Sequence, residues 1–205
     1  MKITLIVEGK TEKVFVPYLR KYLESRLSGS MPLIRVHEYD GRIPKADALK
    51  RVVSRLLEDG RNETDHVIAL TDVYTGSRPR DFEDAQDAIH KMSAWVGPES
   101  RFHAHAAQYD FEAWLLPYWP TIQKLAKHSK TAPSGNPESV NHDKSPAYHI
   151  QEIFRIGGTG KAYVKRRDAD RILRENDLGI AISSCSQLKA LVNTILEICG
   201  ASIIP

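Results

Sequence analysis

Apolar residues follow two alternating patterns through the first half of the chain. Short runs of apolar and β-branched residues, such as residues 3–7 (Ile-Thr-Leu-Ile-Val), are typical of buried strands. Further strands of this kind are predicted at 32–39, 66–72 and 101–108. Apolar residues at helical spacing predict helices at 12–27, 45–60 and 80–95, the first of them capped by Thr11. Repeated strand–helix units with apolar strands predict a Rossmann-like α/β fold, with a mostly parallel sheet flanked by helices on both faces.

The pattern changes after Trp119-Pro120. Residues 129–146 are rich in Ser, Pro, Asn and Gly, which predicts a long loop or a mobile insertion. Helical segments are predicted beyond it, near 146–155, 165–175 and 184–199. We therefore expect three regions: an α/β core at 1–128, the loop or insertion at 129–146, and a helical C-terminal segment at 147–205 that packs on the core.

Composition places the chain among ordinary globular proteins. It has 205 residues, of which 41% are hydrophobic and 27% charged. No apolar run approaches the ~18 residues of a membrane span, and the N-terminus lacks the features of a signal peptide. We therefore expect a cytoplasmic protein without a membrane partner. Cys185 and Cys199 lack metal-ligand spacing, which favours buried thiols.

Positive charge is mild overall but locally dense. The net charge of +3 does not by itself indicate a nucleic-acid partner. Within residues 160–174 the cations are Lys161, Lys165, Arg166, Arg167, Arg171 and Arg174. Such a segment could contact a phosphate backbone, or it could be a solvated helix face balanced by Asp168 and Asp170. The sequence leaves both interpretations open.

The stretch "LIVEGKTEKVF" (5–15) contains Gly-Lys-Thr but does not form a phosphate-binding loop. A Walker loop requires a glycine five positions before its Gly-Lys, and that position is Thr4, inside a predicted strand. Glu8 at the end of this strand therefore requires another explanation.

Acidic residues follow three of the predicted strands. Glu8 closes the first, Asp72 closes the third, and Asp110 with Glu112 follows the fourth. The carboxyl ends of parallel strands meet at one edge of a sheet, so these side chains could lie together. Carboxylate oxygens gathered in this way suit Mg²⁺ or Mn²⁺. Isolated acids at such positions also serve as helix caps or dipole partners, and Glu12 in a first helical turn is an example.

Three motifs, taken in order, resemble the topoisomerase-primase (Toprim) domain. They are "VEGKTEKVFVPYL" at the start, "ALTDVYTG" in the middle and "AQYDFEAWLL" after the fourth predicted strand. Within that superfamily the chain looks like a bacterial family of Toprim-like proteins, similar to the overcoming-lysogenization-defect nucleases and often encoded beside AAA-type or ABC-type ATPases. The resemblance implies a Toprim-like fold and metal-dependent hydrolysis of phosphodiester bonds.

The resemblance also assigns roles to particular acids. Glu8 would be a metal ligand or general base, Glu12 the second acid of a Glu-Gly-x-x-Glu pattern, and Asp72 a metal ligand. The chain departs from the family pattern at Tyr74, where the second acid of an Asp-x-Asp pair would stand. Asp110 or Glu112 could replace that ligand.

A cation is also expected to neutralise charge in the transition state of such a reaction. Lys161, Lys165 or Lys144 could supply it, and the sequence does not choose among them. His103 and His105 share one face of a predicted strand, but the residues that follow lack further zinc ligands, which favours partly buried histidines with hydrogen-bond partners.

Together these features predict a Mg²⁺- or Mn²⁺-dependent nuclease. The resemblance implies that it acts on nucleic acid, with DNA favoured over RNA, and that it works with an ATPase in antiviral defence. The alternative is a catalytically inactive Toprim-fold module that binds nucleic acid or a partner protein without cutting. Tyr74 favours the alternative, whereas retention of Glu8 and Asp72 favours the enzyme.

Overall fold

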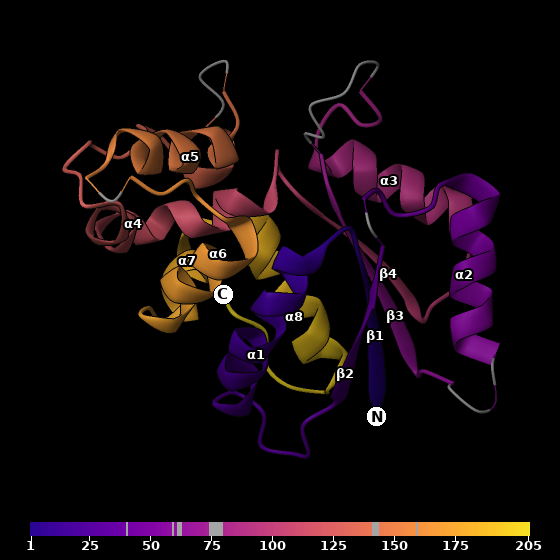
Figure 1. Ribbon diagram of the computed structural model, residues 1–205. Helices are drawn as coiled ribbons and strands as arrows, with labels where there is room; N and C mark the ends of the chain where they lie inside the picture. Colours follow the sequence, from indigo (N-terminus) through magenta and orange to yellow (C-terminus); the bar gives the residue numbers. More distant parts are fainter. Residues whose placement is uncertain (40, 59, 61–62, 74–79, 141–143, 159) are drawn as a thin grey trace.

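Four parallel strands form the centre of the molecule (Figure 1). The computed structural model describes the whole chain except residues 40, 59, 61–62, 74–79, 141–143 and 159. The strands are β1 (Lys2–Val7), β2 (Leu33–Glu38), β3 (His66–Asp72) and β4 (Phe102–Ala107), in the order β2-β1-β3-β4. Val7 pairs with Glu38 and Leu70, and Asp72 pairs with Ala107, so the carboxyl ends of the strands lie at one edge. The predicted parallel α/β fold is confirmed.

Both faces of the sheet are buried, which explains the nearly continuous apolar run of β1. Ile3 and Leu5 contact the cluster that includes α1 (Lys10–Glu24) and α8 (Ser186–Ile198). Ile6 points to the opposite cluster, with α2 (Ala46–Glu58) and α3 (Ala85–Val96). Figure 1 shows α2 and α3 on one side of the sheet and α1 and α8 on the other. Alternate residues of β1 therefore pack against different helical layers.

The C-terminal half of the chain is helical and shares the hydrophobic cluster of β1 and α1. Its elements are the 3₁₀ helices η1 (Phe111–Tyr118) and η2 (Pro137–Ser139), and the helices α4 (Trp119–Ala126), α5 (Pro146–Ile156), α6 (Lys165–Arg174), α7 (Leu178–Ser184) and α8. Helix α6 packs on α1, and α8 packs on β4. The sequence predicted α5, α6 and α8 but missed α4 and α7. Among the described residues, no helix is both long and apolar enough to cross a membrane.

Two helix starts differ from the sequence prediction. Helix α1 begins at Lys10 with Gly9 as its N-cap, so the prediction that Thr11 caps it was wrong. Thr11 lies inside the first turn, and Gly9 carries no side chain that could cap it. Helix α3 begins at Ala85 rather than near residue 80, because the Asp84 side chain accepts a hydrogen bond from the backbone N–H of Asp87.

A buried carboxylate fastens the described part of the predicted loop at 129–146. Glu138 is 8% exposed, and its Oε1 accepts a hydrogen bond of 3.0 Å from Trp114 Nε1. Its Oε2 accepts from Ser186 Oγ at 2.9 Å and from the backbone N–H of Gln187 at 3.0 Å. Glu138 therefore connects this segment to η1 and to the first turn of α8. The division at residues 128 and 146 remains a prediction.

Candidate functional site

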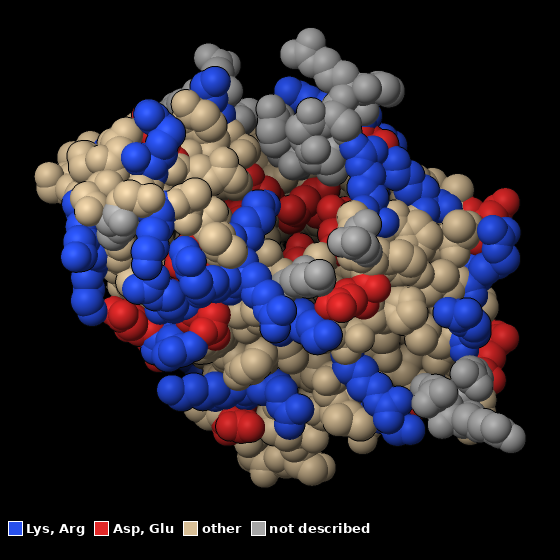
Figure 2. All heavy atoms as spheres, in the orientation of Figure 1, with Lys and Arg blue, Asp and Glu red and all other residues tan. Residues whose placement is uncertain are grey.

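Five acidic side chains gather at the carboxyl edge of the sheet, and we call this place the acidic hollow. These side chains come from the ends of β1 and β3, from the first turn of α1 and from the start of η1. They are Glu8, Asp72, Glu12, Asp110 and Glu112. The parallel strands bring them to one edge although up to a hundred residues separate them in sequence. Figure 2 shows acidic side chains recessed in a hollow near the centre of this face, with Lys and Arg beside them.

Glu8 and Asp72 lie at the ends of neighbouring strands. Thr71 Oγ1 donates a hydrogen bond to Glu8 Oε1, which fixes this carboxylate beside β3. Burial raises the pKa of Glu8 to about 7, against the opposing effect of the Thr71 hydrogen bond, and the charge of Glu12 adds to the increase. Burial also raises the pKa of Asp72 well above its ordinary range, with further contributions from Glu12 and the other acids of the hollow. The two groups therefore resist simultaneous ionisation.

Glu12 completes this side of the hollow. It is 6% exposed and projects from the first turn of α1. Burial raises its pKa, the N–H groups of the first turn oppose that shift, and the charge of Glu112 adds to it. Glu12 is thus an N-terminal dipole partner of α1 as well as a member of the acidic hollow.

Asp110 is a buried member of the acidic hollow that the chain compensates only in part. Its side chain is 4% exposed, and Oδ2 accepts a hydrogen bond of 3.2 Å from the backbone N–H of Ala147. Oδ1 has no hydrogen-bond partner among the described residues. Burial and then the charge of Glu112 raise the pKa of Asp110 to about 7. A buried carboxylate oxygen without a partner is unfavourable, and a bound cation would compensate it.

Glu112, by contrast, has partners from the C-terminal segment. It is fully buried, and its Oε1 accepts a long hydrogen bond of 3.4 Å from Tyr163 Oη. Its Oε2 forms an ion pair of 3.2 Å with Lys165 Nζ. Burial lowers the pKa of Lys165, but the negative charges of Glu112 and the neighbouring acids outweigh burial and leave that pKa above its ordinary value. Lys165 is therefore held protonated at the acidic hollow.

The other two candidate lysines lie in different surroundings. Lys144 Nζ lies 4.9 Å from the centre of the Tyr148 ring, on the surface. Lys161 is exposed in the segment between α5 and α6. Lys165, by contrast, pairs directly with Glu112 of the acidic hollow. Tyr74, the departure from the family pattern, lies outside the described residues.

The donor atoms of the acidic hollow suit a hard divalent cation. All of them are carboxylate oxygens, which favour Mg²⁺ or Mn²⁺ over Zn²⁺. Within the described ranges, no group of three or more His, Cys, Asp or Glu side chains is arranged to hold a metal ion as it stands. The unpartnered Asp110 Oδ1 nevertheless offers a free ligand atom. The residues therefore fit such an ion, and ligation by three of them requires side chains to change rotamer.

The two strand histidines have other partners. His103 Nε2 lies 3.2 Å from His66 Nδ1, and His105 Nε2 lies 3.0 Å from Thr194 Oγ1. Burial lowers the pKa of His105 to about 4, so this ring is neutral at pH 7. The prediction of partly buried histidines with partners holds, except that His105 Nδ1 has no partner among the described residues.

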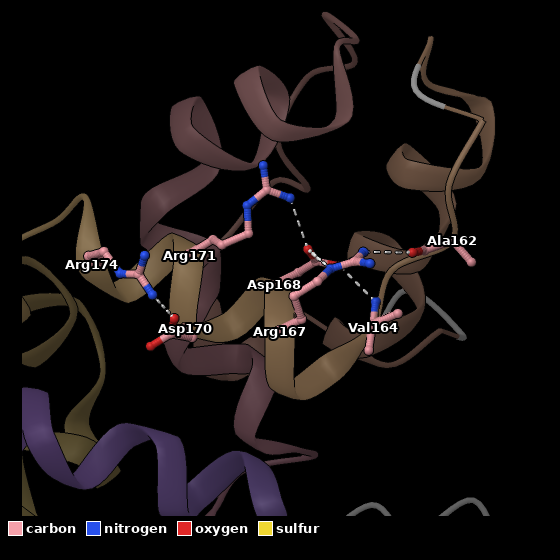
Figure 3. A network of polar contacts seen from close by, with 7 residues as sticks. All are labelled: Ala162, Val164, Arg167, Asp168, Asp170, Arg171 and Arg174. Atoms are coloured by element: carbon pink, nitrogen blue, oxygen red, sulfur yellow. Dashed lines mark hydrogen bonds and ion pairs between the residues drawn. The ribbon is translucent and has the colours of Figure 1, made fainter.

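The basic segment of α6 is more than a solvated face. Asp168 is fully buried, and it accepts hydrogen bonds from Arg167 Nη2 at 2.7 Å, Arg171 Nη1 at 3.3 Å and the backbone N–H of Val164 at 2.8 Å (Figure 3). Burial opposes ionisation, but these partners together hold the pKa of Asp168 below its usual range. Of the two interpretations that the sequence left open, the solvated face balanced by Asp168 does not hold for this residue, because Asp168 is buried beneath its arginine partners.

Sequence reasoning missed two residues that hold the acids in place, Thr71 and Tyr163. Thr71 is a polar residue in an otherwise apolar strand, directly before Asp72, and that position was the available signal. Tyr163 gave no signal, because its partner Glu112 lies 51 positions away in sequence.

Comparisons with known proteins agree with this architecture. Residues 7–196 match a family described as "Domain of unknown function (DUF4276)". No curated protein matches the chain. Among solved structures, the C-terminal region of the Burkholderia pseudomallei OLD protein is similar with a TM-score of 0.54 and 13% identity, over 96% of this chain and 98% of that one. The C-terminal region of the Xanthomonas campestris pv. campestris OLD protein gives a TM-score of 0.44 and 14% identity, over 96% of each chain. The first of these likenesses shows a shared fold.

Proposed function

The chain belongs to the DUF4276 family, and we propose that it is a Toprim-like nuclease that hydrolyses phosphodiester bonds with Mg²⁺ or Mn²⁺ in the acidic hollow. The observation that carries this proposal is Asp110 Oδ1, a buried carboxylate oxygen without a partner among the described residues, which lies beside four further acids. The fold shared with the OLD C-terminal region supports the nuclease class. The sequence resemblance supports the metal-dependent chemistry.

Charge balance within the acidic hollow favours a divalent cation. Lys165 supplies one positive charge by its ion pair with Glu112, whereas the hollow contains five carboxyl groups. Burial and mutual repulsion raise the pKa values of Glu8 and Asp110 to about 7, so these groups are only partly ionised at neutral pH. A bound cation would remove the repulsion and restore their ionised forms.

The contacts suggest different roles for the five acids. Glu8, Asp72 and Asp110 would hold the metal ion, with Glu12 as a further ligand, because none of them forms an ion pair with a lysine or arginine of the described chain. Glu112 would position Lys165. When bound, the metal ion polarises a phosphoryl oxygen and lowers the pKa of a water molecule.

Two residues of the chain would assist that chemistry directly. The hydrogen bond from Thr71 orients the Glu8 carboxylate beside the other acids, so Glu8 is suited to accept a proton from the attacking water. Lys165 is protonated and held by Glu112, so it is suited to neutralise negative charge that develops on the phosphoryl group.

One observation supports the alternative of a module that binds without cutting. No three of the described acids are arranged to hold a metal ion without rotamer changes, and Lys165 partly neutralises the hollow in their place. In that case the acids would serve stability or partner binding.

The sequence resemblance also supports proposals about the partners of the protein and its location in the cell. We propose DNA in preference to RNA as the nucleic acid, a cytoplasmic location, and an AAA-type or ABC-type ATPase as the partner in antiviral defence. Co-purification of the chain with the product of a neighbouring ATPase gene tests the last point. Failure of the two to associate would contradict it.

A plasmid-cleavage assay with Mn²⁺ or Mg²⁺ tests the enzyme proposal. We expect the wild-type protein and Glu58→Gln to cut the plasmid at the same rate. Asp72→Asn should cut at least about a hundredfold more slowly, because it loses a metal ligand. Glu58 is an exposed acid of α2 and a matched control. Nucleic-acid binding without cutting would support the inactive module. Equal cutting by wild type and Asp72→Asn would contradict the metal site.

A further inference from the structure

Two helices begin at the acidic hollow and run away from it side by side. Helix α1 starts two residues after Glu8, and α6 starts with Lys165, whose Nζ pairs with Glu112. Further along, Tyr18 Oη donates a hydrogen bond of 2.7 Å to Asp170 Oδ1, which joins the middle of α1 to the middle of α6. The two helices therefore have the same direction relative to the hollow.

The surface between these helices is hollowed along its length. A depression of about 400 Å³ near the hollow is lined by residues that include Val14, Arg166 and Arg167. A second depression of about 250 Å³ lies further along, between Lys21 of α1 and Arg174 of α6. The contacts advance together along α1 and α6, so the two depressions follow one seam.

A third depression continues the basic surface on the other side of α1. It has a volume of about 470 Å³, lies between α1 and β2, and is lined by residues that include Lys13, Arg20 and Lys21. We use the name basic seam for the cations that line the three depressions: Lys13, Arg20, Lys21, Arg166, Arg167 and Arg174. Figure 2 shows Lys and Arg side chains extending from beside the acidic hollow across this part of the surface.

Half of these cations have no partner within the described chain. Arg167, Arg174 and Lys13 pair with acids of the protein. Arg20, Lys21 and Arg166 form no ion pair or hydrogen bond with any described residue. Their charges therefore remain available for an anionic ligand.

The acids that face the basic seam do not cancel it. Three of them pair with seam cations: Asp168 with Arg167, Asp170 with Arg174, and Glu38 with Lys13. The other two are exposed Glu24 and Asp177, which caps α7 through the Gly179 N–H. Six cations against five acids leave an excess of positive charge along the seam.

We infer that the basic seam binds the sugar–phosphate backbone of a nucleic acid and leads it into the acidic hollow. Helix α1 has 15 residues. At 1.5 Å per residue it spans about 22 Å, which corresponds to roughly six phosphates of one strand. A regular polyanion fits such a row of cations, and the row ends at the carboxylates.

This inference rests on the proposed function, because the acidic hollow must then cut the strand that the seam binds. It also changes the sequence-based view of the cations. The sequence indicated only the segment 160–174, whereas the structure adds cations of α1 and shows that Arg167 and Arg171 hold a buried acid.

Fluorescence anisotropy with a labelled 20-nucleotide DNA, single-stranded and as a duplex, tests the inference in EDTA, where no cutting occurs. The seam variant combines Arg20→Gln, Lys21→Gln and Arg166→Gln, which leaves the cations that pair with acids in place. The matched control combines Lys50→Gln, Arg51→Gln and Arg55→Gln, three exposed cations of α2. Thermal melting establishes that both variants are folded.

We expect the seam variant to bind at least about tenfold more weakly at 100 mM salt. The slope of log affinity against log salt should also fall by about two, because each lost phosphate contact removes about 0.7 to 0.9 of a released counterion. The α2 control should retain the affinity and most of the slope of the wild type.

The alternative outcomes distinguish failure of the basic seam from failure of the proposed function. If wild type binds DNA and both variants bind equally well, the basic seam is excluded and the proposed function stands. If wild type binds neither DNA nor RNA, the proposed function fails together with the seam. If the seam variant binds polyglutamate more weakly than the wild type does but binds DNA equally well, the surface binds an acidic protein and the inference is overturned.

Discussion

Asp110 and Asp168 are two buried aspartates with opposite electrostatic surroundings. Asp110 is 4% exposed and Asp168 is 0% exposed, so burial alone does not distinguish them. Asp168 accepts hydrogen bonds from two arginines, and its pKa lies below the usual range. Asp110 has one unpartnered oxygen and acidic neighbours, and its pKa rises to about 7.

The difference shows how a structural acid can be distinguished from a candidate metal ligand. The chain compensates Asp168 completely with its own groups, so this residue stabilises the start of α6. The chain compensates Asp110 only in part, and Asp110 lies at the carboxyl ends of parallel strands, where ligands bind in such folds. Perturbed pKa values in a hollow of this kind mark functional sites more often than structural ones.

The largest effect is expected at the compensated acid. Asp168→Ala removes the buried acceptor of hydrogen bonds from Arg167, Arg171 and the backbone N–H of Val164. The two arginines are about half exposed and regain water, so we expect a loss of about 3 kcal/mol of unfolding free energy. That loss corresponds to a fall in Tm on the order of 10 °C for a chain of this length. Thermal melting measures it.

Asp110→Asn is the matched comparison for Asp168→Ala. It removes a charge that the described chain compensates only in part and that neighbouring acids repel, so we expect Tm in EDTA to stay equal or to rise by a few degrees. If both substitutions lowered Tm by the same amount, the distinction between the two aspartates would be wrong.

Glu138 provides an intermediate case. It is a buried acid with partners, but these are neutral donors: Trp114 Nε1, Ser186 Oγ and the backbone N–H of Gln187. We expect Glu138→Gln to cost about 1–3 kcal/mol, less than the loss of Asp168, because glutamine keeps one oxygen that can accept hydrogen bonds at the start of α8. Denaturant unfolding measures the difference, and an effect larger than that of Asp168→Ala would contradict the ranking.

The smallest effect is the contribution of the acidic hollow to the pH dependence of stability. Glu8 and Asp110 have folded pKa values of about 7, above their ordinary values of 4.5 and 3.8. Between those values the folded state binds more protons at these two groups than the unfolded state, so their contribution to stability in EDTA should fall as pH rises from about 5 to 7. The lowered pKa of His105, about 4, contributes the opposite slope, so the acids are read from the difference between the wild type and Asp110→Asn. Asp168 has a lowered pKa, so its contribution is complete above pH 3.8 and is constant in this window.

Thermal melting at pH 5, 6, 7 and 8 checks this dependence, and we expect a change of a few degrees. Asp110→Asn should make the curve shallower, whereas the control Glu58→Gln should not. Equal pH slopes of Tm for the wild type and Asp110→Asn would show that the hollow is not a cluster of repelling acids.

Much of this molecule could be predicted from local patterns. The buried strands gave continuous apolar runs because both faces of the sheet are covered, and Glu8 and Asp72 were recognisable because they end two of those runs. Helix α4 was missed because its Trp and Pro residues suggested a break, and α7 because its short apolar sequence lacks a clear helical period.

The partners of the acids could not be predicted, because they come from distant positions. Lys165 was one of three equal candidates, and only the packing of α6 against α1 and η1 brings it to Glu112. The burial of Asp168 depends on two arginines that local composition made appear solvated.

Calorimetric titration with Mn²⁺ at pH 8 tests most directly whether the uncompensated acids form a metal site. At this pH, Glu8 and Asp110 are largely ionised, since their pKa values are about 7. We expect the wild type and Glu58→Gln to bind Mn²⁺ with equal affinity. Asp72→Asn and Asp110→Asn should each bind Mn²⁺ at least about tenfold more weakly, because each loses a charged ligand. Identical binding isotherms for the wild type and both hollow variants would contradict the site.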